Sequence, residues 1–559
     1  MLLMFVILTA ANEASAQSHE KRFTIPCDQN LESPGDCQNE SLETIAATVK
    51  ENTYTDVQID IKIPQLQLNA DVSFTNLNSL IINGEPSSST ITCIADVSAG
   101  IVLSDINGTI KMSNLKLIFC GSIYESDTEF SGDNIKSFRS ALTVTHCGNL
   151  ELNGLVIEKS RGIGLTILNN HGGRVYITST SFEENTFLHE HSNQSSSEPD
   201  YYEGGGVYIS LAGTFMNSSH HLPVNFRFEN CTFKNNTAHT SHYQYLYTDT
   251  LDEVHKGYGR GGGVCVKLES GINNVNVLFL GCEFTANRAF LGGGLAVKIS
   301  GKKDRATKNI TVEIIDSTFE ENGYDDKQGS GYGGGAHLTF NTRSDESKVV
   351  DSHYIVRNTT FMSNYAEFGG GVHYSSDRQG FSDSLKSNSM LFDNCIFQGN
   401  KAHMGSVIIM APSIDGIHRL STGYSASLTF RNCQVLGNVV FADRNREGIG
   451  TMYFSSYDIH FQGYNHFEDN RGSALYIVNG IVDFQKSSVS FINNTGPQGG
   501  AVALIGSSTM IVGPNNYKFI NNTAIYQGGA MYVSLIDSCL LYTSPSPRDA
   551  TLSRMPSSA

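Results

Sequence analysis

A phenylalanine followed three positions later by an asparagine recurs along this chain, and no other feature limits its fold as much. After most pairs comes a glycine run and then a segment in which apolar and polar residues alternate, such as Gly292–Gly294 followed by LAVKI. Alternation of this kind predicts β-strands. The shortest spacings between pairs, Phe467 to Phe491 and Phe491 to Phe519, are 24 and 28 residues, which fits three short strands and three turns. The pairs are Phe182/Asn185, Phe233/Asn236, Phe284/Asn287, Phe319/Asn322, Phe361/Asn364, Phe397/Asn400, Phe467/Asn470, Phe491/Asn494 and Phe519/Asn522, with Val435/Asn438 as a variant.

The repeat predicts an all-β protein, a right-handed parallel β-helix solenoid over residues 57–538. Successive coils of such a stack lie roughly 4.8 Å apart, so equivalent side chains form ladders along its axis. We expect phenylalanines to stack inside, and each asparagine amide to bond both its own turn and the asparagine of the next coil. The ladder residues that we single out are Phe284, Asn287, Phe361, Asn364, Phe491, Asn494, Phe519 and Asn522.

The two ends of the chain depart from this repeat. Residues 1–16 hold a short apolar run and end in Ala-Ser-Ala, which is typical of a signal peptide and predicts a secreted or cell-surface extracellular protein. Residues 17–56 are predicted to form an N-terminal cap, with a short helix at 41–49 and a disulfide between Cys27 and Cys37. Residues 539–559 resemble translated sequencing-adapter sequence and are expected to be unstructured, so membrane anchoring beyond them stays undetermined.

The combination of F-x-x-N with GG[GA]-V resembles the repeats of chlamydial polymorphic outer-membrane proteins. It is even more similar to large β-helix families of sponges and cnidarians, in which C-x-F-x-x-N is followed by GGG-V, as from Cys282 to Gly294 here. The resemblance covers roughly residues 90–535. Because the bacterial proteins are adhesins, it implies a role in surface recognition.

Cysteines and glycosylation sequons give further expectations. Four cysteines stand two positions before a core residue and should point inward, so we predict a ladder of buried thiols in preference to disulfides between coils; they are Cys231, Cys282, Cys395 and Cys433. Three sequons begin one residue before a ladder asparagine and should therefore face outward. We predict glycans on Asn235, Asn493 and Asn521.

Charge and motifs exclude several functions. The formal net charge of −17 with no basic block argues against nucleic acid as a partner. The carboxylate and basic series of pectate lyases and polygalacturonases are missing, as are nucleotide-binding loops and hydrolase motifs. We therefore expect no enzyme activity, no cofactor and no metal site.

Long insertions recur at one point of successive repeats, between the ladder asparagine and the glycine run. They occupy 186–203, 237–260 and 323–332, so they should project from one edge of the solenoid, and they are rich in tyrosine. Tyrosine offers a rigid contact area with a polar tip. The predicted binding residues are Tyr201, Tyr202, Tyr243, Tyr245, Tyr247, Tyr258, Tyr324 and Tyr332.

These observations favour a non-catalytic extracellular scaffold for adhesion or recognition, with an unknown protein or glycan as its partner. A polysaccharide-active lyase or hydrolase is the first alternative, because many β-helix proteins carry such activities. A structural spacer of the extracellular matrix is the second.

Overall fold

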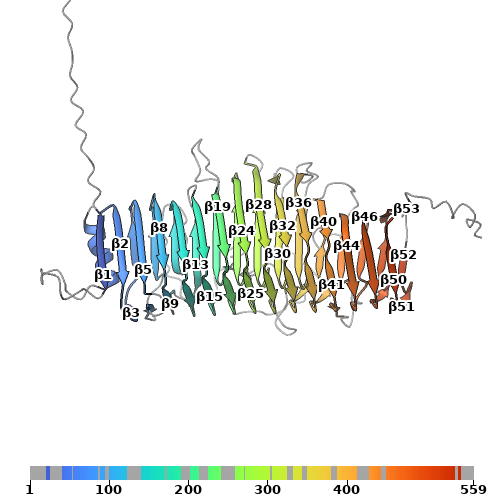
Figure 1. The fold of residues 1–559 in the computed structure, drawn as a ribbon, viewed down its shortest axis with the longest axis horizontal. Coiled ribbons are helices and arrows are strands. Elements are labelled where there is room, and N and C mark those ends of the chain that lie inside the picture. The colour runs from blue at the N-terminus through green and yellow to red at the C-terminus, as the bar shows by residue number, and fades with distance from the viewer. Residues whose placement is uncertain are drawn as a thin grey trace, which may run out of the picture.

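The chain forms a rod of stacked β-coils that runs from blue to red in Figure 1. The computed structural model describes residues 20–25, 41–52, 54–85, 89–94, 100–121, 140–169, 173–189, 202–212, 224–240, 259–269, 271–301, 305–323, 331–342, 349–378, 387–411, 427–441, 449–534 and 539–542. All the strand pairs among these residues are parallel, and each strand pairs with its equivalents one coil before and one coil after it. The predicted parallel β-helix is therefore confirmed.

Three faces make up each coil. We call them the long face, the short face and the third face, and they follow one another along the chain. The coil from β24 (Asn273–Leu280) through β25 (Glu283–Thr285) to β27 (Leu295–Ser300) is typical. A corner separates β24 from β25, the turn of Asn287 follows β25, and a glycine run precedes β27. The long and short faces join into a 29-stranded sheet, and the third face is a 14-stranded sheet.

The strands of each face are as follows. The long face consists of β1 (Glu20–Ile25), β2 (Asp56–Ile61), β5 (Ser79–Gly84), β8 (Thr109–Ser113), β11 (Asn149–Asn153), β14 (Arg174–Thr178), β19 (Val224–Glu229), β24, β28 (Thr307–Ile315), β31 (Val349–Val350), β32 (His353–Arg357), β36 (Ser389–Asp393), β40 (Ser427–Arg431), β44 (Asp458–Glu468), β46 (Ile481–Ile492), β49 (Thr509–Val512) and β53 (Cys539–Tyr542). The short face consists of β3 (Gln65–Leu68), β6 (Thr90–Cys93), β9 (Lys116–Ile118), β12 (Val156–Glu158), β15 (Ser181–Glu183), β20 (Thr232–Lys234), β25, β29 (Thr318–Glu320), β33 (Thr360–Met362), β37 (Ile396–Gln398), β41 (Gln434–Leu436), the ends of β44 and β46, and β50 (Tyr517–Ile520). The third face consists of β4 (Val72–Thr75), β7 (Ile101–Ser104), β10 (Ser140–Thr145), β13 (Ile163–Leu168), β18 (Val207–Ala212), β23 (Val264–Glu269), β27, β30 (Ala336–Thr342), β35 (Val372–Arg378), β39 (Ile408–Met410), β43 (Met452–Ser455), β45 (Leu475–Val478), β48 (Val502–Ile505) and β52 (Met531–Ser534). Small sheets at the turns consist of β16 (Thr186–His189), β21 (Thr237–Thr240) and β26 (Arg288–Ala289); β17 (Tyr202–Glu203) and β22 (Gly259–Arg260); β34 (Tyr365–Phe368), β38 (Lys401–Met404) and β42 (Val439–Val440); β47 (Thr495–Gln498) and β51 (Thr523–Gln527).

Two ladders run through the interior. The rings of the repeated phenylalanines stack from coil to coil, with centroids 4.4 Å apart for Phe284 and Phe319 and 4.8 Å apart for Phe319 and Phe361. Beside them, the Asn287 amide Nδ2 donates to Oδ1 of Asn322 at 3.0 Å and to the carbonyl oxygen of Phe233 at 2.8 Å. The same two bonds recur at Asn364 and Asn494. The ladder thus satisfies the buried polar groups of each turn while the rings fill the core.

Phe519 and Asn522, the last predicted ladder residues, make the same contacts with the preceding coil as the other ladder residues but are more exposed. Phe519 stacks on Phe491 with 5.1 Å between ring centroids, and Asn522 accepts a hydrogen bond from Asn494. Phe519 is nevertheless 37% exposed, because no described coil covers this part of the short face.

Glycine is favoured where the chain enters the third face. Gly292 has a φ of +67°, and a Cβ on it would lie 2.2 Å from the carbonyl oxygen of Leu295. Gly293 faces the backbone of the next coil, where a Cβ would lie 2.4 Å from the amide nitrogen of Gly323. The left-handed backbone favours glycine at the first position of the run, as at Gly369 and Gly405. The second position is less restricted, because Ser406 lies opposite Gly370 on the next coil.

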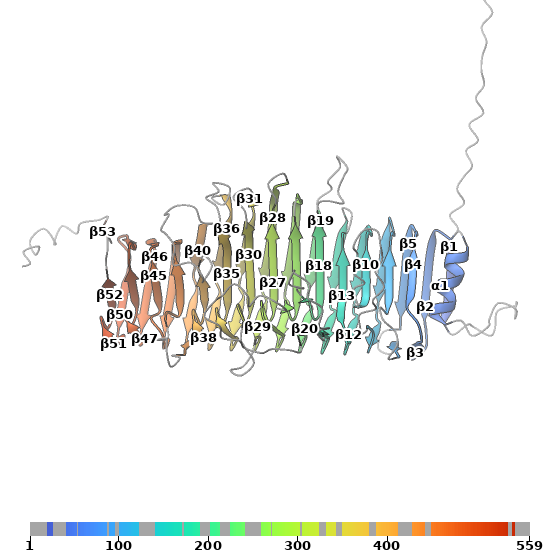
Figure 2. The same cartoon turned by 180° about the vertical axis from the view of Figure 1, so that it is seen from behind.

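Helix α1 (Leu42–Glu51) covers the N-terminal end of the core, as Figure 2 shows. The Ser41 side chain caps it by accepting a hydrogen bond from the backbone N–H of Thr44, and Leu42 and Ile45 are among the side chains that it buries against the first coils. Strand β1 precedes this helix and pairs with β2, so strand pairing begins ahead of the predicted boundary at residue 57. Its six residues alternate too briefly to stand out in the sequence. The signal peptide and both Cys27 and Cys37 lie outside the described residues.

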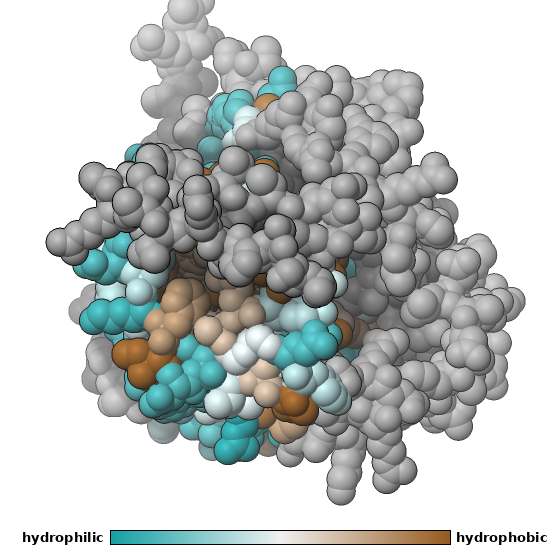
Figure 3. Space-filling view, turned by 90° about the vertical axis from the view of Figure 1, so that its right-hand side faces the viewer, coloured by the Kyte–Doolittle hydropathy of each residue, from teal (hydrophilic) through white to brown (hydrophobic). Residues whose placement is uncertain are grey.

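The opposite end of the rod exposes apolar side chains. Figure 3 looks at this end and shows apolar residues among polar ones. Ile525 is 69% exposed, and Ile520 and Val533 are also exposed. Residues 539–542, which we expected to be unstructured, instead form β53 and pair with β49. Their apolar sequence suits a strand, and this corrects the predicted start of the unstructured segment.

Cysteines appear in two states. Cys93 and Cys120 form a disulfide between neighbouring coils, which the sequence analysis did not predict. The four predicted ladder cysteines, Cys231, Cys282, Cys395 and Cys433, are free and buried, as is Cys147, and Cys265 is buried as well. Burial raises the pKa of Cys147 to about 11 and that of Cys395 well above its usual value. Within the described part of the chain, no helix is long and apolar enough to span a membrane.

Candidate functional site

The corner between the long and short faces widens near the C-terminal end. Val435, the core residue of the short face, follows Phe430, a core residue of the long face, by five residues. On the following coil, Phe467 comes six residues after Phe461, the equivalent of Phe430. On the coil after that, Phe491 comes seven residues after Phe484. The added residues cannot enter the packed interior, because the rings on either side stay in register. They project outward and build a groove.

Gly463 starts this projection. Its φ is +66°, and a Cβ on it would lie 2.1 Å from Oδ1 of Asn432. The same oxygen accepts the backbone N–H of Tyr464 at 3.0 Å. Below the turn, the Asn465 amide donates to Ser487 Oγ at 2.9 Å. These bonds fix the backbone, while the Tyr464 side chain is 54% exposed.

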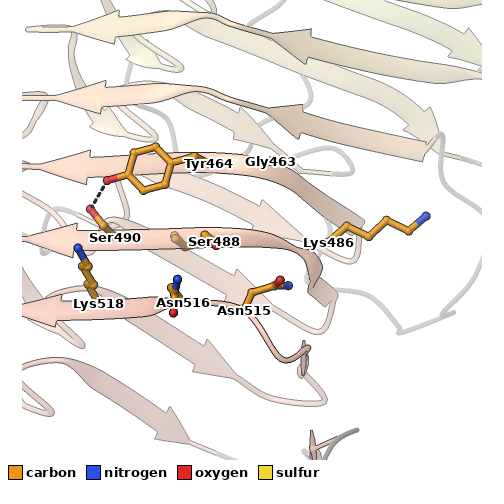
Figure 4. A pocket seen from close by; sticks show the side chains of 9 residues that line it. Gly463, Tyr464, Lys486, Ser488, Ser490, Asn515, Asn516 and Lys518 are labelled. Atoms are coloured by element: carbon orange, nitrogen blue, oxygen red, sulfur yellow. Dashed lines mark hydrogen bonds between the residues drawn. The ribbon is translucent and has the colours of Figure 1, made fainter.

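A groove with a volume of about 440 Å³ lies along the widened corner. It is lined by Gly463, Tyr464, Lys486, Ser488, Val489, Ser490, Asn515, Asn516 and Lys518. Figure 4 shows these side chains coming from three successive coils. Its far wall is held by Asn515, whose amide donates to the carbonyl oxygen of Gln485 at 2.7 Å, and by Tyr517, whose hydroxyl donates to that of Phe484 at 3.1 Å. Hydrogen bonds between successive coils therefore hold the walls of the groove in place.

The lining has a charge opposite to that of the protein. Among the described residues that line it, Lys486 and Lys518 are charged and none carries a carboxylate, whereas the whole chain has a formal charge of −17. The remaining lining residues offer hydroxyl, amide and backbone groups that both donate and accept hydrogen bonds. The groove can therefore hold a polar ligand with a negative group, and the exposed ring of Tyr464 can pack on an apolar face of that ligand.

A chain of hydrogen bonds crosses one wall of the groove. The Tyr464 hydroxyl donates to Ser490 Oγ at 3.3 Å, and Ser490 Oγ lies 2.6 Å from His466 Nδ1. The other ring nitrogen, Nε2, lies 2.9 Å from a carboxylate oxygen of Glu468. Lys518 is in register with Ser490 on the following coil, and its side chain extends toward Ser490 in Figure 4.

Tyr332 is the one predicted binding tyrosine whose side chain the structure describes. Its ring stacks on Phe368 with 5.1 Å between centroids and meets His373 edge-on at 4.8 Å. It is half-buried in this aromatic cluster on the outside of the third face. Only the backbone of Tyr202 is described, in β17, and Tyr201, Tyr243, Tyr245, Tyr247, Tyr258 and Tyr324 lie outside the described residues.

Next to Tyr332, two histidines are buried against each other. The Nδ1 atoms of His337 and His373 lie 3.0 Å apart, and the rings are stacked. Burial lowers the pKa of His373 to about 3 and that of His337 well below its usual value; for His337, the nearby charges of His373 and Arg260 add to the effect. Both rings are therefore neutral at physiological pH.

The predicted glycan positions lie on the surface. Asn235, Asn493 and Asn521 are exposed, and each has a φ near +50°, which turns its side chain away from the ladder asparagine that follows. Among the described residues, no group of three or more histidines, cysteines or carboxylates is arranged to hold a metal ion.

Sequence reasoning missed the groove. We aligned the repeats on their phenylalanine and asparagine positions, which the groove residues do not share. The sequence does show that the corner becomes longer from one repeat to the next. This is seen in the spans from Phe430 to Val435, from Phe461 to Phe467 and from Phe484 to Phe491.

Comparisons with known proteins add a similarity of fold. No protein-family model matches the chain, and no curated protein matches it in sequence. Among solved structures, the catalytic domain of the GH87 α-1,3-glucanase in complex with nigerose aligns with 90% of this chain and 67% of its own, at 9% identity and a TM-score of 0.28. The tailspike protein gp49 from Pseudomonas phage LKA1 aligns with 90% of this chain and 74% of its own, at 11% identity and a TM-score of 0.30.

These similarities correct one expectation. The missing catalytic motifs predicted no enzyme activity, yet catalytic domains are among the solved structures that align with this chain, so that expectation is wrong as an exclusion. At identities of 9–11% and TM-scores of 0.27–0.30, these similarities carry no activity, substrate or site over to this chain.

Proposed function

We propose that this chain is an extracellular recognition protein that binds acidic glycans in the groove at the widened corner. The observation that carries this proposal is the combination of the exposed Tyr464 ring, Lys486 and Lys518 in one groove of about 440 Å³. This volume lies within the usual range for small-ligand sites, about 300–1,000 Å³. A sugar ring offers an apolar face to an aromatic ring and hydroxyls to amides, and a uronate or sulfate group pairs with ammonium groups.

Electrostatics favours an acidic ligand despite the acidic chain. The net charge of −17 repels polyanions at long range, so only a site with local cations can hold one. Lys486 is exposed beside Gly463 and Ser488, and Lys518 lies on the next coil toward the end of the rod. A polymer chain can contact both by lying across successive coils. This arrangement also predicts that binding weakens as salt rises.

The extracellular location rests on three observations. These are the apolar leader with its Ala-Ser-Ala end, the exposed sequons and the disulfide between Cys93 and Cys120. The resemblance of the repeats to those of chlamydial surface proteins supports a role in recognition. Glycan binding by the tyrosine-rich edge at 237–260 stays a separate prediction, tested by deleting 241–258 and measuring the same ligands.

The direct test is a glycan array that presents uronic-acid, sulfated and neutral polysaccharides to the purified chain. We expect binding to acidic glycans that is lost in Tyr464→Ala and retained in Tyr526→Ala. Tyr526 is a suitable control because it is 59% exposed, similar to the 54% of Tyr464, and does not line the groove. Absence of binding to acidic glycans, or equal binding by Tyr464→Ala, would contradict the proposal.

A further inference from the structure

Ser490, which lines the groove, stands in one hydrogen-bonded line with a histidine base and a carboxylate that lie next to the groove. We infer that Ser490, His466 and Glu468 form an acyl-transfer centre that hydrolyses carboxylic esters of carbohydrate hydroxyls, such as O-acetyl groups. The inference rests on the proposed glycan binding only for its natural substrate, because the chemistry itself can be tested with a small ester.

The hydrogen-bond directions are determined by the chemistry of the groups. The Glu468 carboxylate can only accept, so the proton of a neutral His466 ring lies on Nε2, 2.9 Å from the carboxylate oxygen. Nδ1 is then an acceptor, 2.6 Å from Ser490 Oγ, and the serine hydroxyl donates to it. The Tyr464 hydroxyl donates to the same Oγ at 3.3 Å and leaves this direction unchanged. The serine is therefore poised to give its proton to the histidine.

Register explains why the three groups meet. His466 and Ser490 are direct partners on β44 and β46, so their side chains lie one above the other on the outer side of the short face. Glu468 stands two residues after His466 and shares its side of the strand. On the other side of Ser490 comes Lys518, whose ammonium group can stabilise negative charge on an attacked carbonyl oxygen.

The reaction balances with water as the second substrate. Ser490 Oγ attacks the carbonyl carbon, its proton passes to His466 Nδ1, and the bond from that carbon to the sugar oxygen breaks as the sugar oxygen takes the proton from His466. Water then attacks the acyl-serine ester and gives a proton to His466. That proton returns to Ser490 Oγ as the carboxylic acid leaves. The net change is ester plus water to acid plus alcohol.

Tyr464 covers the nucleophile. Ser490 is only 1% exposed, whereas the Tyr464 side chain that bonds to it is 54% exposed and follows a glycine with positive φ. Rotation of this surface side chain would remove one of the groups that cover Ser490, and such rotations are fast. A sugar stacked on a displaced Tyr464 ring would bring an ester on a neighbouring hydroxyl close to Ser490.

The same sheet contains a matched control. Ser389 Oγ lies 2.8 Å from Nδ1 of His353, also on neighbouring coils, but the residue two positions after that histidine is Ile355 instead of a glutamate. The pair thus has the serine–histidine contact without the equivalent carboxylate. If a serine–histidine contact alone were enough, Ser389 would react as Ser490 does.

The experiment treats the purified chain with a fluorophosphonate probe, maps the labelled serine by mass spectrometry, and follows hydrolysis of p-nitrophenyl acetate. We expect labelling at Ser490 and not at Ser389. We also expect a rate at least about 100-fold lower in Ser490→Ala, a substantial loss in Glu468→Gln and no loss in Ser389→Ala. Thermal unfolding of each variant checks that it is folded. An unlabelled Ser490 in the wild-type chain, or hydrolysis unchanged in Ser490→Ala, would overturn the inference without any use of a glycan.

Two variants distinguish glycan binding from the reactivity of Ser490. Tyr464→Ala should lose glycan binding yet be labelled faster by the small probe, because part of the cover is gone. Ser490→Ala should lose the labelling that Tyr464→Ala retains. A wild-type chain that is labelled at Ser490 but binds no acidic glycan would refute the recognition site alone, and a wild-type chain that binds acidic glycans but is not labelled at Ser490 would refute the acyl-transfer centre alone.

Discussion

The Asn287 side chain donates a 3.0 Å hydrogen bond to Asn322 on the next coil, and Asn322 donates an equal bond to Asn364. Each amide also donates to the carbonyl oxygen of a ladder phenylalanine, so Asn322 bonds to Phe284. The backbone N–H of Asn287 shares the same acceptor oxygen on Asn322 at 3.0 Å. One side chain therefore satisfies several buried groups on three coils.

Removing one amide from this ladder should be costly. Asn322→Ala leaves two donors of Asn287 and one acceptor of Phe284 without a partner in a buried position. We expect a loss of about 2–4 kcal/mol of stability, because each buried unsatisfied group costs about 1–3 kcal/mol and part of this can relax. Asn225→Ala, on the half-buried outer side of β19, is the control and should change stability by less than about 1 kcal/mol. Equal midpoints of thermal unfolding for the two variants would refute the ladder's role.

The buried histidine pair should make the rod sensitive to acid. The folded pKa of His373 is about 3 and that of His337 is also well below 6.5, the ordinary value that each has in the unfolded chain. Unfolding therefore takes up protons below pH 6.5, so the stabilising contribution is complete above pH 6.5 and is lost as pH falls toward 3. The loss approaches about 1.4 kcal/mol per pH unit for each histidine.

The check compares thermal unfolding of the wild type and of a His337→Leu/His373→Leu variant between pH 7.5 and 4.5. The variant should show a smaller decrease in midpoint over this range. The same decrease in both proteins would mean that other groups cause the acid sensitivity.

Buried thiols should be chemically silent in the folded protein. Cys147, with its pKa raised to about 11, and Cys395 need both access and ionisation before they can react, and burial denies both. Iodoacetamide at pH 8 should label the peptides that contain them only after denaturation, while Cys93 and Cys120 stay joined until they are reduced. Rapid labelling of Cys147 in the native protein, or linkage of Cys231 to Cys282, would contradict this description.

The apolar end of the rod should promote self-association. Ile525 and Val533 are exposed on the last described coil, next to strand edges that can accept another strand. An Ile525→Lys/Val533→Lys variant should reduce concentration-dependent association in sedimentation velocity. Two matched lysines on the exposed Gln67 and Ser73 positions, at the other end of the rod, should have no effect. A wild type that is monomeric at all concentrations would refute this prediction.

The repeat made the fold predictable, and the departures from it were the parts that the sequence did not reveal. Phe284 and Asn287 recur because every coil must fill the same core and bond the same turn, so pattern alone identifies them. Strand β1 was missed because its sequence, EKRFTI, alternates only from Phe23 to Ile25 and belongs to no repeat. The Cys93–Cys120 disulfide depends on two early coils stacking in register, and this register is visible only in three dimensions.

The candidate site was hidden for a related reason. Tyr464 and Lys486 owe their positions to residues added at a corner, and added residues break an alignment that is based on the core. The contact between His466 and Ser490 joins positions 24 residues apart, so only the coil register brings the two together. By contrast, the tyrosines of the insertions stood out in composition, and the one whose side chain is described, Tyr332, packs in an aromatic cluster.

The most direct test of the proposed recognition function is the affinity for an acidic oligosaccharide, measured by titration calorimetry at two salt concentrations. We expect Lys486→Gln/Lys518→Gln to bind at least about 10-fold more weakly than the wild type, with a smaller dependence on salt. The control, Lys267→Gln/Lys298→Gln, removes the same charge from the third face, where these lysines lie beside Glu269. It should bind as the wild type does. Equal weakening in both variants would show that net charge controls binding, and this result would contradict a site in the groove.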